Sequence, residues 1–111
     1  MTTLDFRKQK KSFLKITLND EAETNLSIMQ PTKELFGKMV AMSDEVGRMD
    51  SADLDALDEV YSVCAELMSR NREGIVVGKG NLEAVLDFED VVTFLKAYGA
   101  FVAGIVGSAK N

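Results

Sequence analysis

The sequence contains no histidine and a single cysteine, Cys64. Histidine is the commonest general base and metal ligand near neutral pH, so its absence excludes the usual catalytic triad and most zinc sites. One cysteine cannot form a disulfide within the chain, which favours a reducing cytosol as the compartment. The first residues also lack the apolar run of a secretory signal, so we expect no export by that route.

Two stretches superficially match ligand-binding motifs, and both fail on spacing. An EF-hand loop counted from Asp50 needs glycine at its sixth position and glutamate at its twelfth, but the chain has Asp55 and Tyr61 there. The stretch GIVVGKG has three residues, not four, before its Gly-Lys pair, and neither serine nor threonine follows. Cys64 has apolar neighbours at helical spacing, which indicates a small buried side chain rather than a reactive thiol. We therefore predict no enzyme, no cofactor and no metal site.

Charge is unevenly distributed within the net charge of −5. Residues 1–18 carry five basic side chains against one acidic, a net charge of +4, whereas the rest of the chain carries −9. Nucleic-acid binding needs a broad basic surface, so an acidic body argues against it. We expect residues 1–11 to form a basic, flexible arm, which is either solvated or docks an acidic partner.

Periodicity predicts an α+β fold. Alternating apolar residues in SFLKITL and TNLSIM predict an antiparallel β-hairpin over residues 12–29. A lone hairpin is marginally stable, so its apolar face must pack on helices. Helical spacing follows over residues 31–107, interrupted by a glycine-rich loop at 72–81. We predict a single domain over residues 1–111, with the N-terminal hairpin packed on a bundle of about three α-helices.

The stretch DFEDVVTFLKAYGAFVAGIVG, residues 87–107, is predicted to be the last helix. Its charged residues leave an uncharged run from Ala97 to Gly107, which is shorter than the roughly 20 residues that span a bilayer, so we predict no membrane span. A helix that is apolar nearly all round is either buried in the core or shared with a partner, and both interpretations stay open. The candidate protein-interaction residues are Phe94, Tyr98, Phe101 and Ile105, with Ala100 and Gly104 allowing close approach of another helix. The partner would be another protein or a second copy of this chain.

The order of these elements is similar to that of a known family. A basic start, LDFRKQKKSFLKITL, leads into the hairpin; MQPTKELFGKMV follows, then SRNREG after the middle helix, and LDFEDVVTFLKAYGAFV near the end. Over nearly its whole length the chain resembles the tail assembly chaperones of siphophages and prophages of Gram-positive bacteria, in their short, unframeshifted form. MQPTKELF and DFEDVVTFLKAYGAFV are the most specific parts of the resemblance.

The resemblance implies a function in protein binding. Members of this family bind the phage tape-measure protein, keep it soluble and help recruit tail-tube subunits. It also implies a location in the cytoplasm of the bacterial host and absence from the mature virion. Two other functions remain open: a structural tail-completion or connector protein that stays in the virion, and a small cytoplasmic regulatory adaptor.

Overall fold

The computed structural model describes residues 11–48 and 54–109, so most of the predicted basic arm lies outside the described residues. Its fold is α+β, as predicted, with a two-stranded antiparallel hairpin followed by helices. The elements are β1 (Leu14–Thr17), β2 (Asn25–Ile28), α1 (Lys33–Arg48), α2 (Leu54–Ser69), α3 (Lys79–Val85) and α4 (Phe88–Ala109). Within the described ranges there are therefore four helices rather than about three, and the additional one is the short α3.

The hairpin has the register that the alternating pattern predicts. Leu14 pairs with Ile28 and Ile16 with Leu26, which places these apolar side chains on one face. The turn is stabilised by the Asp20 carboxylate, which accepts hydrogen bonds from the Thr24 N–H at 2.8 Å and the Thr24 hydroxyl at 2.6 Å. These bonds favour the ionised form, so they lower the pKa of Asp20.

The second edge of β2 is occupied by the segment that follows α2. The Arg72 N–H donates to the Ser27 carbonyl oxygen at 3.0 Å. The Glu73 carboxylate accepts two hydrogen bonds from Ser27, one from its N–H and one from its hydroxyl, each at 2.8 Å. Because β2 is bonded on both sides, β1 is the edge strand of this small sheet.

A polar joint at the end of β2 ties the hairpin to two helices. The Met29 N–H donates to the Arg70 carbonyl oxygen at 2.7 Å, and the Met29 carbonyl oxygen accepts the Tyr98 hydroxyl at 2.7 Å. The Arg70 guanidinium donates to the Gln30 carbonyl oxygen through Nε at 3.1 Å and Nη2 at 2.9 Å. Arg70 follows α2 and Tyr98 lies in α4, so three segments distant in sequence meet at Met29 and Gln30.

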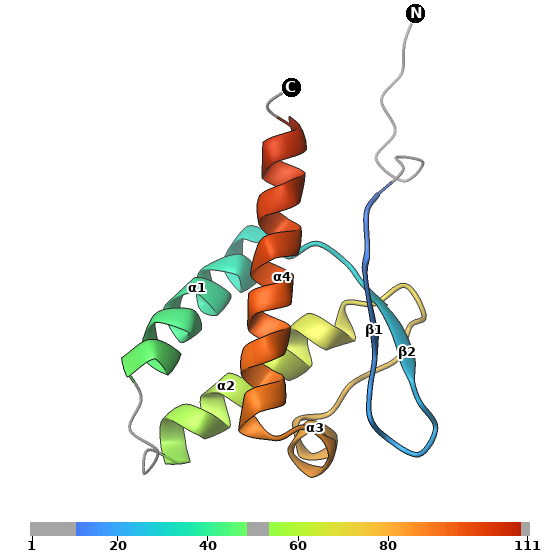
Figure 1. Ribbon diagram of the computed structural model, residues 1–111, viewed down its shortest axis with the longest axis vertical. Helices are drawn as coiled ribbons and strands as arrows, with labels where there is room; N and C mark the ends of the chain where they lie inside the picture. Colours follow the sequence, from blue (N-terminus) through green and yellow to red (C-terminus); the bar gives the residue numbers. More distant parts are fainter. Residues whose placement is uncertain (1–10, 49–53, 110–111) are drawn as a thin grey trace, which may run out of the picture.

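The core lies between α1, α2, α4 and the apolar face of the hairpin. In Figure 1, α4 crosses in front of α2, with α1 on one side and the hairpin on the other. The completely or almost completely buried side chains come from β2, α2, α3 and α4: Leu26, Ile28, Val60, Cys64, Leu67, Met68, Leu82, Val91 and Tyr98. Helix α4 begins where its sequence predicts, because the Asp87 carboxylate accepts the Asp90 N–H at 2.8 Å and the Asp90 carboxylate accepts the Asp87 N–H at 3.0 Å.

The glycine-rich loop predicted at 72–81 is too long by three residues, because Lys79 already begins α3. Tertiary contacts override the weak helix propensity of this segment: Leu82 is completely buried, and the Lys79 ammonium pairs with the Asp58 carboxylate of α2. The preceding loop is organised by side chains from the end of α2. Asn71 Oδ1 accepts the Ile75 N–H and Asn71 Nδ2 donates to the Ile75 carbonyl oxygen, at 2.8 and 2.7 Å.

We predict that Tyr98→Phe lowers the free energy of unfolding by about 1–3 kcal/mol, because it removes the hydroxyl that the Met29 carbonyl oxygen accepts. Urea unfolding followed by circular dichroism measures the change. Tyr61→Phe is the matched control, since the Tyr61 hydroxyl also donates to a main-chain carbonyl oxygen, that of Leu86. Tyr61 is only partly buried, so its loss should lower the free energy of unfolding by less. Equal unfolding curves for wild type and Tyr98→Phe would contradict a stabilising joint.

Candidate protein-interaction site

The six predicted interaction residues lie on different faces of α4. Phe94 and Tyr98 face the core, with 7% and 0% of their surface exposed. Their rings form an aromatic row with Phe101, with centroid distances of 5.7 and 5.9 Å between neighbours. Phe94 and Tyr98 thus offer almost no surface to a partner in this structure. Their position is explained by packing within the chain.

Phe101 and Ile105 are only partly buried, although they continue the same stripe of the helix. Figure 1 shows the reason, because the last turns of α4 extend beyond α1, α2 and α3. Among the described residues, fewer groups are available to cover the stripe there. The second half of α4 therefore keeps part of its apolar surface accessible.

An adjacent face of this half of α4, about a quarter turn around the helix from that stripe, is built from small exposed residues. Ala97, Ala100 and Gly104 follow one another at steps of three and four residues, and all three are exposed. A Cβ added at Gly99 or Gly104 would meet no heavy atom within 4 Å among the described residues. These glycines cost about 0.8–1.0 kcal/mol each in helix propensity relative to alanine, and packing within the described chain does not require them. The small-residue face is open to a neighbour outside the described residues.

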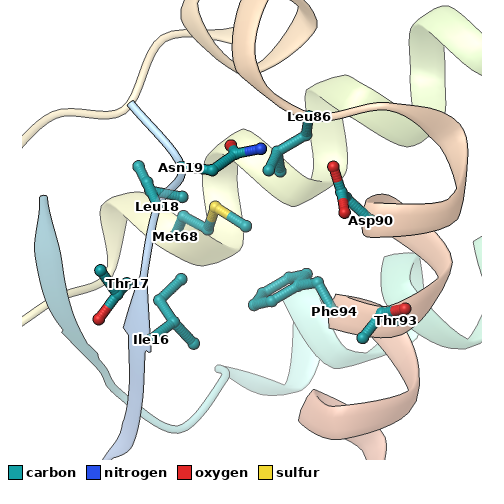
Figure 2. Close-up of a pocket in the computed structure, with 9 residues that line it drawn as sticks. All are labelled: Ile16, Thr17, Leu18, Asn19, Met68, Leu86, Asp90, Thr93 and Phe94. Atoms are coloured by element: carbon teal, nitrogen blue, oxygen red, sulfur yellow. The ribbon is translucent and has the colours of Figure 1, made fainter. Parts of the chain in front are cut away.

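A groove separates β1 from the first half of α4 (Figure 2). Its volume is about 220 Å³, and its lining is mostly apolar, with Ile16, Met68 and Phe94 among the contributors. Figure 2 shows Ile16 and Phe94 directed toward each other across the space, while Asp90 and Thr93 line its α4 side. The alternating pattern predicts that Ile16 points inward. No local signal indicates the groove, because Ile16 and Phe94 on its two walls are almost 80 residues apart in sequence.

The charge at the α3–α4 corner is negative. Burial and, after it, the carboxylates of Asp87 and Glu83 raise the pKa of Tyr61, whose hydroxyl donates to the Leu86 carbonyl oxygen at 2.8 Å. Asp90 lies in the same region and, among the described residues, is the one charged residue that lines the groove. The groove is thus apolar with an acidic wall, which suits an apolar ligand that carries a basic group.

The described residues contain no cluster of side chains that could hold a metal ion. Within residues 11–48 and 54–109, no three or more cysteine and carboxylate side chains gather closely enough to hold a metal ion. Cys64 is completely buried, which confirms the prediction of a small core side chain. Burial raises the pKa of its thiol to about 12, so the reactive thiolate is disfavoured.

No helix within the described residues is long and apolar enough to cross a membrane.

No family model matches the chain, and neither the curated proteins nor the solved structures contain a match to it.

We predict that folded protein resists thiol modification. At pH 8 the Ellman reagent should react with Cys64 at least about a hundredfold more slowly in buffer than in denaturant, because the thiol is buried and protonated. The absorbance of released thionitrobenzoate measures the rate. Rapid labelling of the folded protein would contradict a core position for Cys64.

A second prediction concerns alkaline pH. Folding raises the thiol pKa of Cys64 from 9.0 to about 12. Between these two pH values the thiol is protonated in the folded chain but ionised in the unfolded chain, so rising pH favours unfolding. The contribution of Cys64 to stability is therefore constant below pH 9 and decreases as pH rises from 9 toward 12. Urea unfolding at a series of pH values should show this decrease, and Cys64→Ala should reduce it. An unchanged slope in that variant would contradict the assignment.

Proposed function

We propose that the protein is a tail assembly chaperone of a siphophage or prophage. In this role it binds the tape-measure protein in the host cytoplasm, keeps it soluble and helps recruit tail-tube subunits, and it does not enter the mature virion. The proposal combines the sequence resemblance with one structural observation. That observation is the second half of α4, where apolar and small residues remain accessible on a helix of 22 residues.

The two stretches that carry the resemblance meet in the structure. MQPTKELF begins with Met29 and DFEDVVTFLKAYGAFV contains Tyr98, and the Tyr98 hydroxyl donates to the Met29 carbonyl oxygen at 2.7 Å. The polar joint thus gives Met29 and Tyr98, one residue from each stretch, a role in folding rather than in binding. Ala100, Phe101, Gly104 and Ile105 are left to account for binding, because among the described residues no buried contact explains the small side chains of Ala100 and Gly104.

The chemistry of α4 suits an apolar helix as the bound segment. The resemblance implies a long, aggregation-prone tape-measure protein as the ligand, and we propose that an amphipathic helix of it is bound. A helix with small side chains lets such a helix approach closely. The acidic character of the body, with a net charge of −5 for the whole chain, favours solubility of the complex. A second copy of this chain is the alternative ligand of the same face.

The first experiment is co-expression with the tape-measure protein encoded downstream, followed by measurement of its soluble and co-purifying fractions. Retention of soluble tape-measure protein supports the proposal. Aggregation with this chain and also with any frameshifted longer form would overturn it. Mass spectrometry of purified virions separates a chaperone, which is absent from them, from a tail-completion or connector protein, which is present.

We predict that Gly104→Leu reduces the co-purified tape-measure protein by about tenfold, since an added side chain blocks close approach of a helix. The fold should persist, because a Cβ at Gly104 meets no heavy atom within 4 Å among the described residues and leucine has a higher helix propensity than glycine. Circular dichroism and size-exclusion chromatography test folding and self-association in the same samples.

Gly37→Leu is the matched control. Gly37 lies in α1, is exposed and likewise has no heavy atom within 4 Å of an added Cβ. The same chemical change there should leave binding unaltered. Equal binding by Gly104→Leu and wild type would remove the small-residue face from the proposal, and unfolding of Gly104→Leu would show that this part of α4 is core.

A further inference from the structure

The outer edge of β1 exposes backbone groups that can pair with another strand. In the hairpin, the Leu18 N–H donates to the Thr24 carbonyl oxygen at 2.9 Å, and residues along a strand alternate in the side to which their backbone groups point. Leu14, Ile16 and Leu18 therefore bond toward β2, while the N–H and C=O groups of Lys15 and Thr17 point outward. Within residues 11–48 and 54–109, no hydrogen bond between elements reaches the main chain of Lys15 or Thr17.

At the other edge of the hairpin, the outward-pointing backbone groups of β2 have hydrogen-bond partners. On β2 the outward backbone groups of Ser27 are bonded to Arg72 and Glu73, and the Met29 N–H is bonded to Arg70. The equivalent groups of β1 border the groove of Figure 2, since Thr17 lines it although its side chain points away from Phe94. A strand added beside β1 would lie about 4.8 Å from it and direct every second side chain toward the groove.

The charges around this edge argue against a second copy as the occupant. Pairing of β1 with β1 of another copy would place two Lys15 side chains on one face, within a residue or two of each other, and like charges on neighbouring strands are destabilising. The groove side instead carries Asp90, whose carboxylate attracts a cation. A complementary strand has an acidic or polar residue near Lys15 and apolar residues with one basic side chain on the groove face.

We propose that β1 is a docking edge for an extended segment of a different protein, which pairs with the backbone of Lys15 and Thr17 and inserts alternate apolar side chains between Ile16 and Phe94. A basic side chain of that segment lies against Asp90. An amphipathic helix would fill the groove but leave the backbone of β1 unpaired, so the unpaired edge favours an extended ligand. The inference is separate from the proposed function, because it concerns a second surface and holds for any partner with this pattern.

The test is selection of linear ten-residue peptides, displayed from a random library, on the full-length protein. Enriched peptides are synthesised, and their dissociation constants are measured by fluorescence anisotropy with wild type and two variants. Thr17→Pro removes one outward N–H without removing a ladder bond to β2. It should weaken binding by about tenfold or more. Thr17→Val keeps that N–H and loses only the hydroxyl, which donates to Asn25 Oδ1 at 2.7 Å, so it should bind within about twofold of wild type.

Two further measurements keep the outcome decisive if Thr17→Pro disturbs the hairpin. N-methylation of the peptide at alternate residues removes its donors and should abolish binding in one of the two registers only. Asp90→Asn should weaken peptides that carry a basic residue by about two- to fivefold, and less at high salt. Absence of enrichment, equal binding by Thr17→Pro, insensitivity to N-methylation, or helical bound peptides would each overturn the proposal. A change of oligomeric state in Thr17→Pro would assign the edge to a second copy and would overturn it as well.

Discussion

The arrangement of the chain depends on how two consecutive carbonyl groups at the end of β2 are satisfied. The Met29 carbonyl oxygen accepts the Tyr98 hydroxyl of α4, and the Gln30 carbonyl oxygen accepts the Arg70 guanidinium at the end of α2. A carbonyl group that loses contact with water without gaining a partner is costly, so these bonds stabilise the meeting of the strand end, α2 and α4. Burial raises the pKa of Tyr98 to about 12, which keeps its hydroxyl protonated as the donor over the physiological range.

This joint divides α4 into two parts with different surroundings. Before Tyr98, the helix crosses α2 and contributes Val91, Phe94 and Leu95 to the core. After it, the helix continues past the other helices, so Phe101 and Ile105 are partly covered and Ala100 and Gly104 are exposed (Figure 1). A helix of this composition would gain from a neighbour along its second half, and the proposed chaperone function supplies one. The aromatic row from Phe94 to Phe101 continues across the boundary between the two parts.

The same joint makes the sheet asymmetric. Because the chain after α2 returns along β2, that strand is bonded on both sides, and the unpaired edge falls on β1. The edge borders a groove whose far wall is α4, so the position of α4 against the hairpin also determines the groove (Figure 2). The two surfaces suit different ligands: small side chains on α4 favour a helix, whereas unpaired backbone on β1 favours an extended strand.

Local pattern alone determined the hairpin and its inward residues, the start of α4 at Asp87 and the burial of Cys64, because alternation, capping and helical spacing are properties of neighbouring residues. It could not determine where α3 begins, because Gly78 and Gly80 predict a loop as far as residue 81, whereas the helix already begins at Lys79 and buries Leu82. Nor could it separate Phe94 and Tyr98, which the core covers, from Phe101 and Ile105, which it covers only in part, since all four share one helical stripe. That distinction depends on where α2 and the hairpin end along α4. The polar joint and the groove were likewise decided by tertiary structure, because they unite residues about 40 to 80 positions apart that no local pattern connects.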